Sequence, residues 1–588
     1  MKQFFVTVAG VFAGLLLFFV GVPMILIAIL AGQAKPSGPP ARMVLSLDLR
    51  GALTDQGSNN PLSVIRGGSR SVMGVVQTLH RAETDDRVKA LIIRLPEQGL
   101  APAAADELRL AVKAFRKAGK RVVAHSQGVY ASGAAVSTYM LGSAADEFWM
   151  QPGASLQAVG MASDDVFLKR AFDKYGVTAD YQQRYEYKNA VNPFLYDDYT
   201  PAHREATLAW MGSVYQSALN AAAADRRMQP AALKALLEAG PYVAEDALAR
   251  RLIDRVGQVH QAQGALLRLA GEGARLVDIG DYSPGDRNAA AANTVAVINA
   301  EGAIVTGSAQ GGGLGQASAV YSDDVAKAFY DAARDRKVKA VVFRISSPGG
   351  SDTASEQILD GVRAAKAAGK PVVVSMGTYA ASGGYWIASQ ASGIVAEPTT
   401  LTGSIGVYGG KFAVGQALAR FGVDMRSLTV GGDFADAFGP GQPFSPGQET
   451  AVSAWMDHIY QGFVQRVSQG RDLPVERVQA IAKGRVWTGE QAKGLGLVDQ
   501  IGGFYDALAY AKRLANIPAD QAVELKTMPT RRSTLDMIQE ALGVGAEGAK
   551  TLAAVAWVMG DPRAQSLLED AARARLGVAG STVLAPTP

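Results

Sequence analysis

The first pattern along the chain is an apolar stretch from Phe4 to Ala31, which is 28 positions without a charged residue. About 20 apolar residues suffice to cross a bilayer as a helix, whereas the apolar region of a secretory signal peptide is only about 7–15 residues long. The stretch therefore predicts an uncleaved membrane anchor over residues 1–34, with a long signal peptide as the alternative. Residues 32–42 are rich in Gly, Pro and Ser and predict a flexible tether to a soluble body.

Beyond the tether, short apolar runs alternate with longer mixed stretches. Residues 339–345 (KAVVFRI) are apolar and rich in β-branched side chains, which is typical of a buried parallel strand. A glycine-rich turn follows, and then a predicted helix over 354–368, a strand over 371–376 and a further helix from Tyr385. Strand, helix and strand at this spacing predict right-handed βαβ units, and hence an α/β fold.

The chain repeats itself. Residues 88–133 and 338–383 align at a constant offset of 250 without a gap, and 16 of the 46 positions are identical. About one in sixteen is expected by chance, so the body is a tandem duplication, and self-similarity at a fixed offset is the mark of repeated architecture. The predicted division is a membrane anchor at 1–34, a first α/β repeat at 41–282, a second at 293–525 and a tail of unknown role at 526–588.

Composition narrows the chemistry. The chain has no Cys, so it forms no disulfide and no thiolate metal site. Its five His do not occur at the spacing of a zinc site, and we expect neither a metal nor a cofactor. The 58 basic and 54 acidic residues leave a net charge of only +4, without a basic run, which argues against nucleic-acid binding.

Two turns of the second repeat are candidates for chemistry. One is Ser347-Pro348-Gly349-Gly350, where the glycines let backbone N–H groups approach a ligand. The other contains Ser382 and Gly383, where small neighbours leave the Ser382 hydroxyl accessible at the start of a helix. Both turns follow predicted strands, whose carboxyl ends form the usual crevice of an α/β sheet. Each signal alone is weak, because a serine at a helix start is far more often an N-cap than a nucleophile.

The first repeat has lost parts of this setting. Leu100 stands where the second repeat has Gly350, and its side chain would crowd a loop of N–H donors. Ser132 corresponds to Ser382, but Ala134 and Ala135 follow in place of Gly384 and Tyr385. Ser132 is therefore a rival nucleophile in a poorer setting.

A serine nucleophile needs a base, and no His lies near Ser382 in the sequence. His125 belongs to a strand of the first repeat, where we expect it to pack. The known alternative is a Ser–Lys pair. Lys188 of the first repeat has aromatic and apolar neighbours that could desolvate it and lower its pKa, although a solvated surface lysine is the plainer interpretation. At the local offset of 246, the second repeat has Phe434 in its place. Each repeat lacks what the other carries, which predicts one composite site where they meet.

At these residues the sequence resembles the signal peptide peptidase A family in its long, tandem, membrane-anchored form. The resemblance covers the chain from the anchor to about residue 525. It is carried by SSPGGSDTASE (346–356), GKPVVVSMGTYAASGGYWIAS (369–389), LTGSIGVYG (401–409), YKNAVNPF (187–194) and GRVWTGEQAKGLGLVDQIGG (484–503).

The resemblance implies a crotonase-like fold, shared with Clp-type proteases, and a serine peptidase without a cofactor. Ser382 would be the nucleophile, Lys188 the general base and Ser404 the residue that orients the lysine, while Gly349 or Gly350 with Gly383 would form the oxyanion hole. It further implies a homotetramer at the bacterial inner membrane whose body faces the periplasm and degrades apolar peptides such as cleaved signal peptides. Two alternatives stay open, a non-catalytic membrane scaffold and another crotonase-fold acyl transfer enzyme that acts on acyl-CoA.

Overall fold

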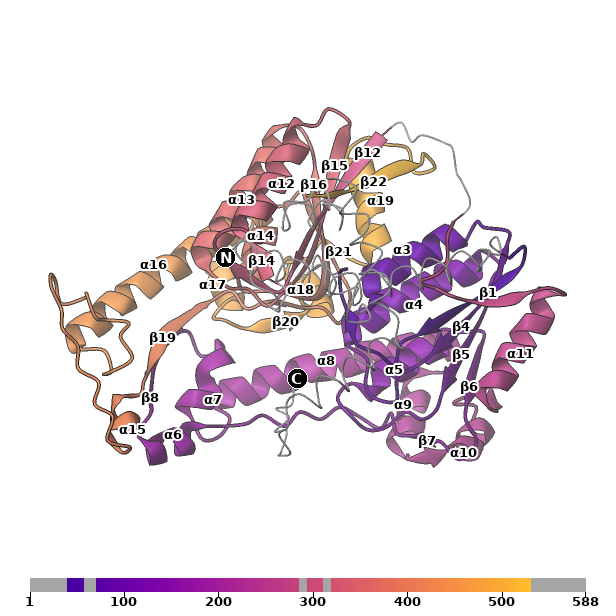
Figure 1. Cartoon of the computed structure of the whole chain (residues 1–588), viewed down its shortest axis with the longest axis horizontal. Helices are drawn as coiled ribbons and strands as arrows, with labels where there is room; N and C mark the ends of the chain where they lie inside the picture. The colour runs from indigo at the N-terminus through magenta and orange to yellow at the C-terminus, as the bar shows by residue number, and fades with distance from the viewer. Residues whose placement is uncertain (1–39, 58–69, 285–292, 310–318, 530–588) are drawn as a thin grey trace, which may run out of the picture. The chain divides into compact units, whose positions relative to one another are not determined.

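The computed structural model describes residues 40–57, 70–284, 293–309 and 319–529 (Figure 1). The predicted anchor and all but the first residues of the predicted tail lie outside these ranges. Among the residues that the structure describes, no helix has the length and apolar character needed to cross a membrane.

The first repeat is built on a six-stranded parallel sheet of order β10-β6-β5-β4-β1-β11. Helices α3, α4, α5 and α8 pack on one face and α11 on the other. The elements are β1 (Met43–Asp48), β4 (Val88–Arg94), β5 (Arg121–Ser126), β6 (Glu147–Met150), β10 (Arg255–Val256), β11 (Arg275–Asp278), α3 (Val72–Ala82), α4 (Pro102–Lys117), α5 (Ala135–Ser143), α8 (Pro201–Arg226) and α11 (Val259–Ala270).

The second repeat is built on an eight-stranded sheet with the path β20-β18-β16-β15-β12-β22, in which β17 and β21 continue from β16. All pairs are parallel except β18 with β20. The elements are β12 (Asn293–Glu301), β15 (Val338–Ser347), β16 (Val372–Ala381), β17 (Gly393–Ala396), β18 (Leu401–Gly403), β20 (Val486–Thr488), β21 (Gln500–Ile501), β22 (Val523–Met528), α12 (Ser322–Arg334), α13 (Asp352–Ala367), α14 (Gly383–Ala388), α16 (Pro446–Arg471) and α19 (Phe504–Leu514).

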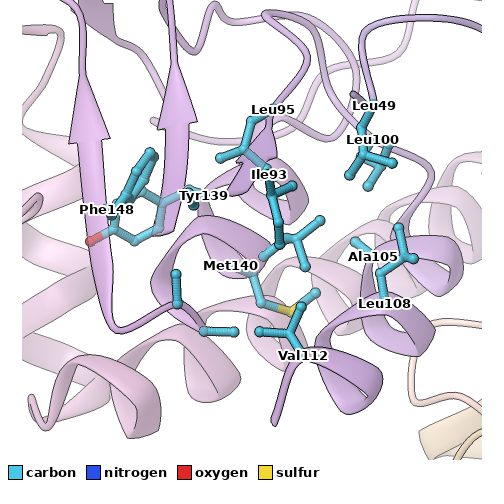
Figure 2. Packing of buried hydrophobic residues seen from close by; sticks show 14 of the residues in the cluster. Leu49, Ile93, Leu95, Leu100, Ala105, Leu108, Val112, Tyr139, Met140 and Phe148 are labelled. Atoms are coloured by element: carbon cyan, nitrogen blue, oxygen red, sulfur yellow. The ribbon is translucent and has the colours of Figure 1, made fainter. Parts of the chain in front are cut away.

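The predicted α/β alternation is confirmed, because strands β15 and β16 and helix α13 follow the predicted pattern closely. Nine of the ten residues of β15 are buried, as expected for a strand covered on both faces. In the first repeat, Leu100 turns its side chain into the core beside Leu49 and above the start of α4 (Figure 2). Leu100, which corresponds to Gly350 of the second repeat, therefore packs in the core of the first repeat.

Both sheets belong to one compact unit. Several contacts join the repeats within it, among them a two-stranded ribbon and a buried ion cluster. The first is an antiparallel ribbon of β8 (Thr178–Arg184) from the first repeat and β19 (Val407–Ala413) from the second, which lie side by side in Figure 1. Lys188 of the first repeat follows β8 after only a few residues. The ribbon therefore determines where Lys188 lies relative to the second repeat.

The second contact is a buried ion cluster. Arg344 of β15 donates two hydrogen bonds to the carboxylate of Asp55, at 3.0 and 2.6 Å, and one of 2.7 Å to Glu107 of α4. It also donates to the hydroxyl of Ser375 on β16, at 2.9 Å. All four side chains are buried. On folding, the Arg344 guanidinium therefore loses its contacts with water and gains contacts with two carboxylates of the first repeat. Charge-assisted, bidentate contacts of this kind fix geometry strongly.

Candidate active site

Ser382 lies in the turn between β16 and α14. Its φ of +54° is in the left-handed region, which a residue with a side chain rarely adopts and which often marks a functional turn. Its N–H donates to the carbonyl of Gly403 at 2.9 Å, and its carbonyl accepts from Tyr385 and Trp386 in the first turn of α14. The Ser382 side chain forms no capping hydrogen bond to the helix. The Ser382 hydroxyl therefore does not act as an N-cap of α14.

The hydroxyl instead accepts a hydrogen bond from the other repeat. Lys188 Nζ lies 3.1 Å from Ser382 Oγ. The same ammonium nitrogen lies 2.9 Å from both the carbonyl oxygen and the hydroxyl of Ser404. The Lys188 residue is only 3% exposed, so the interpretation of a solvated surface lysine is wrong. The structure thus brings together Ser382, Lys188 and Ser404.

The environment of Lys188 is polar but uncharged. Burial alone lowers the pKa of Lys188 from 10.5 to about 7. Desolvation disfavours the ammonium form, and a neighbouring carboxylate would have opposed that effect. Lys188 therefore exists partly as the free amine near neutral pH, which is the form that can accept a proton.

The backbone around Lys188 and Ser404 is held closely. Ser404 has a φ of +49° and donates its N–H to the carbonyl of Arg485 at 2.7 Å. Gly484 comes so close that a Cβ atom there would lie 2.5 Å from Lys188 Cβ, and its φ is +80°. Gly484 is a residue whose role the sequence analysis missed, although it opens one of the motifs that carry the family resemblance. Only a glycine lets this loop pack against the lysine stem.

The glycine turn after β15 lies against the Ser382 turn. A Cβ atom on Gly349 would lie 2.7 Å from the nitrogen of Gly383, and a Cβ atom on Gly383 would lie 3.1 Å from the nitrogen of Gly350. The Gly349 N–H already donates to Ser347 Oγ at 3.2 Å. Gly350 has a φ of +155°, and a Cβ atom there would lie 2.1 Å from the Ile304 carbonyl oxygen. The sequence left open whether Gly349 or Gly350 is the oxyanion-hole donor. Only the N–H of Gly350 is not already bonded to Ser347.

The corresponding turns of the first repeat are built differently. The N–H of Leu100, which corresponds to that of Gly350, donates to the hydroxyl of Thr138 at 3.0 Å. Ser132 is exposed, and its position corresponds to Ser382 without a lysine partner among the described residues. His125 is buried on β5, where its Nε2 lies 3.0 Å from the carbonyl oxygen of Gly257. The expectation that His125 packs within the first repeat is met, and Ser132 is left without the surroundings of Ser382.

Nothing in this arrangement suggests a metal centre. Over the described ranges, no group of three or more His, Asp or Glu side chains is placed to hold a metal ion. The chemistry available at the site is that of a hydroxyl, an amine and backbone N–H groups.

Comparison with known proteins identifies the family of this chain. The sequence profile of peptidase family S49 matches residues 114–271 and 364–518, which is one match in each repeat and more than half of the chain together. The Protease 4 of Salmonella typhi is 34% identical over 539 residues, which are 87% of this chain and 84% of that protein. The chain belongs to peptidase family S49.

Further S49 relatives are more distant. The Protease 4 of Haemophilus influenzae is 31% identical over 86% of this chain and 85% of that protein. The chloroplastic serine protease SPPA of Arabidopsis thaliana is 27% identical over 85% of this chain and 73% of that protein. Among solved structures, a ClpP1 from Listeria monocytogenes aligns with a TM-score of 0.24 and 14% identity, over 36% of this chain and 94% of its own. This S49 chain is a serine peptidase, and each of the two S49 regions covers part of one of the duplicated sheets.

Proposed function

We propose that this chain is a membrane-anchored Ser–Lys endopeptidase in which Ser382 is the nucleophile and Lys188 the general base. One observation carries the proposal, namely that Lys188 Nζ lies 3.1 Å from Ser382 Oγ in a buried setting that lowers the lysine pKa to about 7. A base within hydrogen-bond reach of the hydroxyl, and with a pKa near the working pH, is what nucleophile activation requires.

The reaction proceeds by acyl transfer. Neutral Lys188 takes the proton of Ser382 Oγ as the oxygen attacks the carbonyl carbon of a peptide bond. The resulting ammonium then donates this proton to the leaving amine as the C–N bond breaks, which leaves an ester on Ser382. A water molecule, deprotonated by Lys188 in the same way, attacks the ester, and the proton returns to Ser382 Oγ as the carboxylic product leaves. Atoms and charge balance without any cofactor.

Backbone donors stabilise the oxyanion of each tetrahedral intermediate. The N–H groups of Gly350 and Gly383 are the donors that we propose, because their turns are in contact and the Gly349 N–H is bonded to Ser347. One such donor contributes about 3–4 kcal/mol to transition-state stabilisation in a comparable hydrolase. Ser404 orients the lysine through its carbonyl oxygen and its hydroxyl, both 2.9 Å from Nζ.

The substrates that we propose are apolar peptides, among them signal peptides left in the membrane after secretion. The uncharged stretch from Phe4 to Ala31 supports a single membrane span, and the family resemblance supports a body in the bacterial periplasm. An anchored peptidase meets such peptides where they remain. The same family resemblance supports a homotetramer and a crotonase-like fold of each repeat.

The test is cleavage of a fluorogenic apolar peptide by the full chain in detergent. We expect Ser382→Ala and Lys188→Ala to lose nearly all activity, and Ser132→Ala to retain it as a matched control in the other repeat. Full activity in the Lys188→Ala variant would show that Lys188 is not the general base. A wild-type chain that cleaves no peptide would favour a scaffold.

A further inference from the structure

Because the chain is a tandem duplication, each strand of the β8–β19 ribbon has a corresponding segment in the other repeat, and these two corresponding segments are not paired with each other. Around this ribbon the repeats align at an offset of 246, at which Tyr175-Gly176-Val177 corresponds to Phe421-Gly422-Val423. Residues 178–184 form β8 and therefore correspond to residues 424–430. Residues 407–413 form β19 and correspond to residues 161–167. In the chain, β8 pairs with β19, but residues 424–430 and 161–167 belong to no strand.

Both duplicates are open to solvent. Leu428 is 100% exposed and Val430 is 97% exposed, although both are apolar. Val166 in the other segment is 69% exposed. Large exposed apolar residues that gather in one segment mark interaction surfaces more often than isolated ones do. Within the described chain, neither segment forms backbone hydrogen bonds of a ladder, so each presents an edge that can pair with another strand.

The intra-chain ribbon joins unlike surfaces, because the first repeat contributes β8 and the second contributes β19. Duplication leaves a β8-like segment on the second repeat and a β19-like segment on the first. Such an interface is heterologous, and it is satisfied when one copy follows another head to tail.

We propose that residues 424–430 of one copy pair antiparallel with residues 161–167 of a second copy, and so repeat between chains the ribbon that β8 and β19 form within the chain. The proposal rests on the homotetramer of the proposed function and deepens it by naming the interface. Strand addition at an exposed edge supplies main-chain hydrogen bonds, and the side chains then select the register.

The intra-chain register transfers residue by residue. Lys411 lies opposite Asp180 in the β8–β19 ribbon, and this pair becomes Asp165 opposite Arg426 between copies. The charges are exchanged, but the pair remains complementary. Val407 opposite Arg184 becomes Met161 opposite Val430, which is an apolar pair. Opposite charges and apolar pairs directly across an antiparallel ladder are stabilising, and like charges there are destabilising.

A second surface of the first repeat is also left incomplete. Arg94 corresponds to Arg344 at the offset of 250, but its partner through Nη2 is only Gln127, at 2.6 Å, and its buried Nε has no hydrogen-bond partner. The residue that corresponds to Glu107 is the exposed Gln357. A second copy would therefore bring an amide rather than a carboxylate toward Arg94, so this contact between copies lacks the ion cluster that holds the two repeats of one chain together.

The proposal also explains why the duplicate interface builds no second active site. Phe434 stands at the position of Lys188, Ala158 at that of Ser404 and Leu100 at that of Gly350. The composite formed by the second repeat of one copy and the first repeat of the next contains Ser132 and Gly133, but it has no lysine at the position of the base, and the Leu100 N–H at the position of Gly350 is bonded to Thr138. One active site per chain follows.

The test uses the absence of native cysteine in the full chain. In the proposed register Ser163 lies opposite Leu428, and the Cα atoms of directly opposed antiparallel residues are within disulfide range. We mix the Ser163→Cys chain with a separately tagged Leu428→Cys chain in detergent, oxidise, and count disulfides that carry both tags. The matched control replaces the neighbouring Thr429 with Cys, because its side chain faces the other side of the ribbon. We expect the mixed disulfide with Leu428→Cys and at most about a tenth as much with Thr429→Cys.

Charge reversal supplies the second arm. Asp165→Arg and Arg426→Asp each place like charges in register, and each should raise the dissociation constant of the oligomer about two- to fivefold, whereas the double variant restores it. Chains that sediment as oligomers but give no mixed disulfide, or equal amounts with Thr429→Cys, overturn this interface and leave the homotetramer standing. A monomeric chain overturns both. Oligomers that cross-link as expected but cleave no peptide support the interface and refute only the Ser–Lys mechanism.

Discussion

Lys188 and Ser382 lie 194 positions apart in the sequence, yet Nζ of one lies 3.1 Å from Oγ of the other. The lysine comes from the first repeat and the serine from the second, and the β8–β19 ribbon brings them together. Neither repeat alone contains both groups. Anything that separates the repeats should therefore remove activity even if both sheets remain folded.

The first prediction concerns pH. Burial lowers the pKa of Lys188 to about 7, and only the neutral amine can take the Ser382 proton. We expect kcat/KM to level off above about pH 8 and to fall tenfold per pH unit well below pH 7, so that about 1% of the plateau remains at pH 5. A pH profile with a fluorogenic apolar peptide measures this. A profile that stays flat from pH 7 to pH 5 would contradict a lysine base.

The second prediction concerns the stability cost of the buried lysine. Since the pKa of Lys188 falls from 10.5 in the unfolded chain to about 7 in the folded chain, the unfolded chain binds more protons between these pH values. The contribution of Lys188 to folding stability is therefore least favourable below about pH 7 and improves as the pH rises toward 10.5. Lys188→Met removes this penalty, and we expect it to raise the unfolding free energy by a few kcal/mol at pH 6, from about 1.4 kcal/mol per pKa unit.

The same variant provides its own control through pH. The advantage of Lys188→Met over wild type should shrink steadily from pH 7 to pH 10, because folding of the wild type releases the Lys188 proton in this range and that release costs less free energy as the pH rises. Other titrating groups are common to both proteins and cancel in the difference. Denaturant unfolding at several pH values measures it. An advantage that does not depend on pH would mean that packing, and not charge, explains the gain.

The third prediction concerns the close approach at Gly484. A Cβ atom there would lie 2.5 Å from Lys188 Cβ, on a backbone with a φ of +80°. Gly484→Ala should therefore displace the lysine from Ser382 and lower kcat by about a hundredfold, since an error of about 1 Å in a reacting group has this effect. The matched control is Gly494→Ala, where a Cβ atom meets nothing within 4 Å. Equal activity of the two variants would show that the loop adjusts without moving Lys188.

Much of the site could be predicted from the sequence because the chain contains its own comparison. Alignment of the two repeats allows Ser382 to be compared with Ser132 and Gly350 with Leu100. It also indicates that the candidate base and the candidate nucleophile come from different repeats. The choice between Gly349 and Gly350 needed coordinates, because it depends on a hydrogen bond from the Gly349 N–H to the Ser347 hydroxyl. The role of Gly484 also depends on a close approach between residues far apart in the chain, for which a single sequence has no signal.

The ion cluster was missed for a related reason. Arg344 and Arg94 occupy the same place in the repeat, and nothing in the sequence distinguishes them. Only the packing of the two repeats brings Asp55 and Glu107 to one arginine and not to the other. Local patterns predicted the strands well, because each strand is decided by its own residues, whereas contacts between repeats depend on both surfaces at once.

The last prediction concerns Arg344 itself. Its guanidinium lies 2.6 Å from Asp55 and 2.7 Å from Glu107, and all three side chains are at most 4% exposed. Arg344→Met would leave two buried carboxylates without their cation, and removal of one partner of a buried pair typically costs 3–5 kcal/mol. We expect a loss of about that size in the unfolding free energy, accompanied by a loss of activity, because the same contact helps to hold Lys188 of one repeat at Ser382 of the other.

Two variants isolate the cause of that loss. Lys327→Met breaks an exposed pair with Asp331 on α12 and should change the unfolding free energy by less than about 1 kcal/mol. The triple variant Arg344→Met, Asp55→Leu and Glu107→Leu removes the stranded charges as well, and apolar replacement of a buried ion cluster is often neutral or stabilising. We therefore expect the triple variant to regain most of the stability that Arg344→Met loses. A triple variant as unstable as the single one would show that the hydrogen bonds of this cluster, including the one of 2.8 Å from the Phe504 N–H to Glu107, and not the unpaired charge, hold the repeats together.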